Sequence, residues 1–261
     1  MTIIDAIILG IFQGMTEFLP VSSSGHNEII ESILKINAYE NNLLTITVLH
    51  AATALSTVII FKKEFCKTFS GFFMFNCSNE FKFSVKIIIS MIPAVIIGLF
   101  FEKSIDLLFQ NNLLLVGIML IVTGILLFLS DKKIKTDKGI SFKNAFIIGL
   151  AQSIAILPGL SRSGSTISTA IFLGIDKKLA AKFSFMMVVP LILGKMIKDI
   201  YELKLFDLNE EFTPLFFGFL SAFFTGLISC SFMIKLVEKS KLRYFSVYCF
   251  IMGFICFIKF Y

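Results

Sequence analysis

The sequence predicts an all-α integral membrane protein with one membrane domain, residues 1–261, built as an inverted-topology repeat. We expect two re-entrant helix–loop–helix segments to meet near the bilayer midplane, beside about six full spans. Three observations lead to this architecture. The chain is strongly apolar, the charge of successive polar loops changes sign, and one serine-rich motif occurs twice.

The apolar content indicates a membrane protein. Of the 261 residues, 56% are hydrophobic and 32 are Phe, and the mean hydropathy is +0.88. Soluble domains carry only roughly 45–50% apolar residues. An apolar helix of about 18–20 residues crosses the roughly 30 Å hydrocarbon layer. Such segments cover residues 43–61, 83–101, 113–130, 179–197, 213–233 and, in a shorter form, 244–258.

The charged loops predict the orientation of these spans. Residues 62–86, 131–143 and 235–243 each carry a net charge of +3, whereas residues 28–40 and 195–211 each carry −2. Loops rich in Lys and Arg stay in the cytoplasm, so the basic loops should lie inside and the acidic loops outside. This topology accounts for the overall net charge of +6, which therefore does not indicate a nucleic-acid partner.

Two segments are too polar to span and are expected to turn back. The stretch QGMTEFLPVSSSGH, residues 13–26, should enter from outside and return through residues 27–36. Residues 142–175 begin and end beside basic loops, so this stretch should be re-entrant from inside. Irregular backbone is tolerated at membrane depth only where protein buries it or water reaches it. The two loops should therefore meet.

A weak internal repeat agrees with this arrangement. An offset of 139 residues superposes Gly10 on Gly149 and Gln13 on Gln152. The same offset superposes the S-x-S-G motif of residues 22–25 on that of residues 161–164. The predicted pseudo-repeats cover residues 1–130 and 140–261, and inverted repeats of this kind place a site where their broken helices meet.

Two charged side chains lie at membrane depth, Glu17 in the first loop and Arg162 in the second. A lone charge there costs several kcal/mol unless it is paired or solvated, so both are candidate site residues. The alternative is a buried ion pair between Glu17 and Arg162 that only joins the two halves.

The residues around this pair are of the kinds that bind phosphate. Arg162 offers a planar fork of N–H donors, and helices expected to start near Asn27 and Thr166 would direct positive dipole ends to the same point. Seven hydroxyls flank the pair: Ser22, Ser23, Ser24, Ser161, Ser163, Ser165 and Thr166. Helix capping is the alternative for each of them, and we favour it for Ser24 and Ser165.

The first loop also contains the groups needed to activate a hydroxyl. His26 titrates near neutral pH, and Ser22 or Ser23 supplies a nucleophile. The alternative for His26 is a capping or hydrogen-bonding role at a helix start. A water that Ser23 positions is the alternative nucleophile.

Glu17 has several possible functions beside a phosphate. It holds a divalent cation together with Gln13, one helical turn earlier, or it acts as a base, or it orients His26. The sequence leaves these alternatives open. We expect His50, in the middle of the first span, to lie at most behind the site.

The motifs GMTEFLPVSSSGH, PGLSRSGSTIS and FSFMMVVPLILG resemble the bacterial undecaprenyl-diphosphatase family, also called the bacitracin-resistance protein family. The resemblance covers essentially the whole chain. It implies a hydrolase that removes the terminal phosphate of undecaprenyl diphosphate and returns the lipid carrier to peptidoglycan synthesis. It also implies an interdigitated inverted-repeat fold in the bacterial cytoplasmic membrane, a site that opens to the outer face, and dependence on Mg²⁺ or Ca²⁺.

The resemblance assigns roles to particular residues. Glu17 matches a motif carboxylate, Ser23 the nucleophilic or phosphate-binding serine, His26 the catalytic histidine and Arg162 the phosphate-binding arginine. Gln13 stands where many members have a first glutamate, which weakens the case for a metal held by Glu17 and Gln13. Ser161, Ser163 and Thr166 match phosphate contacts of the second loop, and the residue types of the first loop add Ser22 and Ser24.

A transporter or flippase for phosphate or a lipid phosphate is the alternative function, because inverted repeats with broken helices are common in transporters. His26 beside a serine favours the phosphatase, since a carrier needs binding groups but no proton shuttle. A homodimer stays open, because lipid-facing Phe side chains do not determine the oligomeric state.

Overall fold

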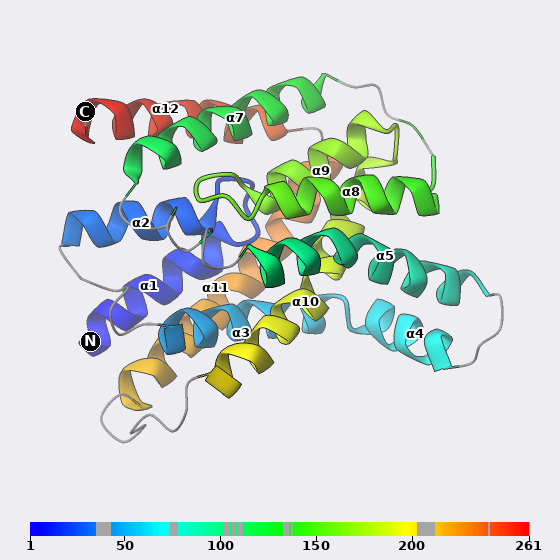
Figure 1. The fold of residues 1–261 in the computed structure, drawn as a ribbon, viewed down its shortest axis with the longest axis horizontal. Coiled ribbons are helices and arrows are strands. Elements are labelled where there is room, and N and C mark those ends of the chain that lie inside the picture. The colour runs from blue at the N-terminus through cyan, green and yellow to red at the C-terminus, as the bar shows by residue number, and fades with distance from the viewer. Residues whose placement is uncertain are drawn as a thin grey trace.

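The computed structural model describes residues 1–34, 43–73, 78–101, 112–132, 138–202, 212–239 and 241–260, and the single positions 105, 108 and 136. Over these residues the fold is helical (Figure 1). The helices are α1 (Ile3–Thr16), α2 (Ser23–Leu34), α3 (Leu43–Ile60), α4 (Lys62–Phe73), α5 (Asn79–Phe100), α7 (Leu113–Asp131), α8 (Phe142–Ile154), α9 (Arg162–Phe172), α10 (Lys177–Glu202), α11 (Phe212–Glu238) and α12 (Leu242–Phe260).

The chain is a multi-pass membrane protein. Within the described residues, α5, α7, α10 and α11 are long and apolar enough to cross a bilayer. A fifth candidate combines α3 with the start of α4, across a bend of 85°. Five of the six predicted spans correspond to these helices, and the sixth, residues 244–258, lies in the shorter apolar helix α12. The exact number of spans stays a prediction.

One helix was not predicted. Residues 62–86 were expected to form a basic loop, but Lys62–Phe73 form α4 and the next helix begins at Asn79. α4 exposes Lys62, Lys63 and Lys67, while Phe65 packs toward the core. A helix satisfies its own backbone hydrogen bonds, and this one combines a basic exposed face with an apolar residue directed to the core. Of the two acidic segments, residues 28–34 belong to α2 and residues 195–202 to α10, and the other residues lie outside the described ranges.

The helices of the two halves exchange partners. α1 packs along α11, and α8, its counterpart at the 139-residue offset, packs along α5. α7 and α12 lie side by side, as do α3 and α10, so each of these pairs joins one half to the other. The inverted repeat remains a prediction that this pairing supports.

Two glycines of the repeat motif allow the exchanged pairs to approach closely. A Cβ atom at Gly10 would collide with the carbonyl oxygen of Gly218 on α11, and one at Gly149 would collide with that of Ser90 on α5. Only a residue without a side chain fits such a backbone contact. The G-x-x-Q motif therefore marks the point where each short helix crosses a long one.

The two predicted re-entrant segments appear as helix pairs with a break between them. α1 and α2 are separated by residues 17–22, and α8 and α9 by residues 155–161. Both α2 and α9 pack on α7. The breaks thereby come together inside the helical bundle, which positions the site described next.

Candidate active site

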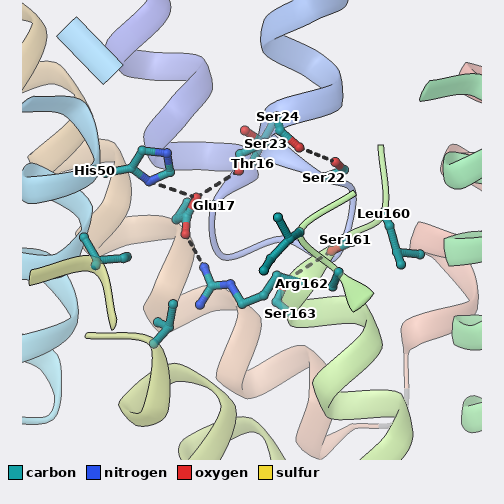
Figure 2. A pocket seen from close by; sticks show the side chains of 14 residues that line it. Thr16, Glu17, Ser22, Ser23, Ser24, His50, Leu160, Ser161, Arg162 and Ser163 are labelled. Carbon is teal, nitrogen blue, oxygen red and sulfur yellow. Dashed lines mark hydrogen bonds and ion pairs between the residues drawn. The ribbon is translucent and has the colours of Figure 1, made fainter. Parts of the chain in front are cut away.

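Both breaks line one pocket (Figure 2). α3 contributes His50 to it, and α10 contributes Val188 and Ile192. The polar lining residues are Thr16, Glu17, Ser22, Ser23, Ser24, His50, Ser161, Arg162 and Ser163. The structure thus brings together most of the residues that the sequence singled out.

Glu17 is the centre of the polar contacts. One carboxylate oxygen, Oε1, is paired with Arg162. The other, Oε2, accepts hydrogen bonds from Ser23 Oγ at 2.9 Å and Gln13 Nε2 at 3.0 Å, and lies 3.7 Å from His50 Nδ1. The Glu17 side chain is only 5% exposed. A buried carboxylate is tolerated when it is paired and hydrogen-bonded in this way.

Arg162 uses only part of its guanidinium on Glu17. Nη2 donates to the carboxylate, whereas Nη1 is buried and has no hydrogen-bond partner. A buried charged donor without an acceptor is costly, and Arg162 lines the pocket. The free edge of the guanidinium therefore suits an anion, and a phosphate can accept from it.

Two serines cap the helices that follow the breaks. Ser22 Oγ accepts from the backbone N–H of Gly25 at 3.2 Å, and Ser161 Oγ accepts from that of Gly164 at 3.1 Å. The helices consequently begin about four residues earlier than predicted, with Ser23 and Arg162 rather than near Asn27 and Thr166. The prediction that Ser24 and Ser165 are the caps is corrected accordingly.

These caps place two equivalent residues at the pocket. Ser23 is the first residue of α2 and Arg162 the first residue of α9, and they are 139 positions apart. The N-terminal turns of both helices line the pocket, so their unpaired N–H groups and positive dipole ends lie close to it. Such ends favour an anion.

The remaining predicted phosphate contacts divide into two groups. Ser24 Oγ lies 3.2 Å from Ser22 Oγ, and Ser163 Oγ lies 3.3 Å from Ser161 Oγ, so all four hydroxyls are close to the pocket. Thr166 is one turn deeper, where Oγ1 hydrogen-bonds with Ser184 Oγ at 2.6 Å, and it does not line the pocket. The structure therefore does not bring Thr166 to the phosphate position.

Of the two histidines, His50 lines the pocket and His26 does not. His26 is 3% exposed and does not line the pocket; its Nδ1 lies 2.8 Å from the Ser22 carbonyl oxygen and its Nε2 lies 2.7 Å from the Tyr248 hydroxyl. His50 does line the pocket and approaches both Gln13 and Glu17. A polar ring in the middle of an apolar span was the signal that could have identified His50.

The contacts of Gln13 and Glu17 do not favour a directly bound divalent cation, and a metal at these two residues stays a prediction. Gln13 is 1% exposed, and its amide contacts Glu17, His50 and Asn27. Both Glu17 oxygens already accept from donors, whereas Mg²⁺ and Ca²⁺ need oxygen lone pairs directed at the ion. Across the described ranges, no group of three or more His, Cys, Asp or Glu residues could hold a metal.

The chain resembles known proteins over almost its full length. A family model described as bacitracin resistance protein BacA matches residues 6–255. Undecaprenyl-diphosphatase of Christiangramia forsetii is 54% identical over 254 residues, which cover 97% of this chain and 96% of that protein. Proteins of the same name from Parabacteroides distasonis and Methanococcus vannielii are 46% and 40% identical, over 96% and 95% of this chain and 96% of each relative.

Proposed function

The chain belongs to the family of the bacitracin resistance protein BacA, and we propose that it hydrolyses undecaprenyl diphosphate in the pocket between the two helix breaks. It is a membrane-embedded hydrolase that removes the terminal phosphate of the polyprenyl diphosphate and yields the monophosphate carrier. The observation that carries the assignment to this pocket is the buried Nη1 of Arg162, which has no partner. The terminal phosphate would supply its acceptor.

Substrate binding changes the environment of Glu17. A phosphate that accepts from Arg162 competes with the Glu17 carboxylate for the same guanidinium. As positive charge is drawn toward the phosphate, the carboxylate becomes a better proton acceptor. Ser23 already donates its hydroxyl proton to Glu17 Oε2 at 2.9 Å, so the base and the nucleophile are in contact.

The reaction then proceeds by displacement at the terminal phosphorus. Ser23 Oγ bonds to this phosphorus, the Ser23 proton passes to Glu17, and the bond to the bridging oxygen breaks, which releases the lipid monophosphate. Water then attacks the phosphoserine and loses a proton to solvent, Glu17 returns its proton to Ser23 Oγ, and the bond between Oγ and phosphorus breaks, which releases orthophosphate. Arg162 and the two helix N-termini stabilise the charge on the transferring group.

His26 and the divalent cation have more limited roles in this proposal. A proton shuttle at His26, which the resemblance implies, requires Nε2 to be released from Tyr248, because both ring nitrogens are engaged. A dependence on Mg²⁺ or Ca²⁺ remains part of the proposal, with the cation carried by the diphosphate oxygens.

The surroundings of the pocket suit a lipid substrate. Ile156, Leu160, Val188 and Ile192 form its apolar side, and the prenyl chain would lie against them. We place the protein in the bacterial cytoplasmic membrane with the pocket open to the outer face, because the basic segments before α5, after α7 and after α11 should lie inside.

The two arginines of the chain provide a matched test. Arg162→Ala should lower orthophosphate release from undecaprenyl diphosphate in detergent micelles by at least about 100-fold, because it removes the charged donor at the phosphate. Arg243→Ala, at an exposed position in α12, should leave the rate unchanged.

Two results would contradict this proposal. Near-normal turnover by Arg162→Ala would show that the reaction does not take place in this pocket, and transport of a lipid phosphate in liposomes without hydrolysis would favour a carrier.

Mass spectrometry of acid-quenched protein should detect a phosphorylated Ser23 peptide. An active Ser23→Ala variant would show that water is the nucleophile.

A further inference from the structure

We propose that Tyr248 is a positioning residue, which holds His26 and thereby the turn at Ser22 that directs Ser23 to Glu17. This inference rests on the proposed role of Ser23. Tyr248 belongs to α12 and is separated from His26 by 222 positions in the chain. The contact therefore joins the last helix of the protein to its first loop.

The hydrogen bonds of His26 define which ring nitrogen carries the proton. A carbonyl oxygen can only accept, so His26 Nδ1, at 2.8 Å from the Ser22 carbonyl, must be the donor. In a neutral imidazole Nε2 is then an acceptor, and it accepts from the Tyr248 hydroxyl at 2.7 Å. The two rings also stack, with centroids 5.6 Å apart and an angle of 9° between their planes.

Ser22 has a backbone conformation that needs support. Its φ is +70°, and within the described residues Ser22 is the one residue other than glycine with a positive φ. Such a conformation is costly for a residue with a Cβ atom and persists where its surroundings hold it. The Ser22 carbonyl accepts both from His26 Nδ1 and from the His26 backbone N–H at 3.2 Å.

The turn at Ser22 sets the direction of the next residue. Ser23 begins α2 immediately afterwards, and its hydroxyl reaches Glu17. Removal of the Tyr248 hydroxyl leaves Nε2 without a donor, which takes away one of the two contacts that favour the Nδ1–H tautomer of His26 and so shifts the equilibrium toward the tautomer with the proton on Nε2. That tautomer cannot donate to Ser22, so the turn loses one of its two supports.

Tyr248→Phe tests this chain of contacts, because it keeps the ring that stacks on His26 and removes only the hydroxyl. We expect kcat for undecaprenyl diphosphate to fall by about tenfold, since a small displacement of a nucleophile lowers the rate strongly. KM should change by less than about twofold, because Arg162 and the apolar side of the pocket are untouched. Tyr244→Phe, one turn earlier on α12 and exposed, is the matched control and should behave as the wild type.

A spectroscopic measurement tests the same idea without catalysis. The chain has two histidines, so ¹⁵N-histidine labelling of the full-length protein in nanodiscs gives two imidazole signal sets, which a His50→Asn sample assigns. His26 should have its proton on Nδ1 in the wild type and shift toward the Nε2 tautomer in Tyr248→Phe. Tyr244→Phe should leave the spectrum unchanged.

The two readouts separate the possible failures. An unchanged kcat in Tyr248→Phe, or an unchanged His26 tautomer, would overturn the positioning role. A rise in KM with constant kcat would also overturn it, because Tyr248 would then bind substrate. If the wild-type protein released no orthophosphate, the proposed function would fail, whereas the tautomer of His26 would still report on the Tyr248 contact.

Discussion

At the scale of single residues, the carboxylate of Glu17 organises the pocket. It accepts from Arg162, Ser23 and Gln13 at once, so its charge is neutralised and its oxygens are occupied. Loss of one partner of a buried ion pair costs roughly 3–5 kcal/mol. The same contacts use three of the roughly four lone-pair positions of the carboxylate, so Glu17 has little capacity left for a cation in the absence of substrate.

Because the Glu17 carboxylate already accepts these hydrogen bonds, we predict that it does not bind a metal ion directly in the absence of substrate. Titration of Mn²⁺ against the purified protein, followed by electron paramagnetic resonance, should show the same weak binding in the wild type and in Glu17→Gln. Addition of a non-hydrolysable diphosphate should strengthen binding in both, because the phosphate oxygens provide the ligands.

The control for this measurement is Glu64→Gln, in which a carboxylate paired with Lys182 outside the pocket is removed. Binding in the wild type without diphosphate that is lost specifically in Glu17→Gln would show that Glu17 coordinates the ion directly.

The residues of the site could be predicted to different degrees. Charge at membrane depth identified Glu17 and Arg162, and the structure pairs them. The same rule applies to His50, a polar ring in the middle of a span, although we expected it to lie at most behind the site. Tyr248 could not be identified, because its contact with His26 depends on the packing of helices far apart in the sequence.

At the scale of helices, close backbone contacts connect the two halves. The crossing of α8 over α5 depends on Gly149, where an added Cβ atom would meet the carbonyl group of Ser90. The crossing of α1 over α11 depends in the same way on Gly10. Neither contact can be relieved by rotating a side chain, because the obstacle is backbone.

Gly149→Ala should therefore destabilise the protein. We expect a loss of about 1–3 kcal/mol, which is typical of overpacking, and a lower midpoint in thermal unfolding of the detergent-solubilised protein. Gly98→Ala is the matched control on α5, because no atom lies within 4 Å of its added Cβ.

Alanine at position 98 should leave the midpoint unchanged or raise it slightly, since alanine is favoured over glycine in helices. Equal midpoints for the two variants would contradict the importance of the Gly149 crossing.

The helices were largely predictable from apolar length, and their ends were not. The N-termini of α2 and α9 lie earlier than expected because Ser22 and Ser161 act as caps, and both motifs offer several hydroxyls that could do so. Composition cannot select among adjacent serines, since the choice depends on the backbone conformation of the turn. α4 was not predicted, because a run of basic residues between two spans is typical of a loop.

At the scale of the whole molecule, the helix pairs that join the two halves determine which helix ends lie on the same side of the membrane. The sign of the loop charges predicts that α4 lies on the cytoplasmic side. Cys66 is exposed on α4, whereas Cys230, Cys249 and Cys256 are buried free thiols. Cys66 is thus a natural probe of orientation.

A membrane-impermeant maleimide should label Cys66 in inverted membrane vesicles and leave it unlabelled in intact spheroplasts, in a Cys77→Ser background. Phe212→Cys, at the exposed start of α11, should give the opposite pattern when Cys66 and Cys77 are both replaced by Ser. Labelling of Cys66 from outside would reverse the proposed orientation and would place the pocket opening on the cytoplasmic face.

The first residues of α2 and α9 illustrate what a single chain gains over a symmetric pair of identical subunits. In such a pair, the two equivalent positions would have to carry the same amino acid. Here one position carries a hydroxyl, Ser23, and the other a guanidinium, Arg162, so in the proposed reaction two equivalent helix starts supply different groups, one to attack the phosphate and one to hold it. A single chain permits this difference, because each position can change independently of the other.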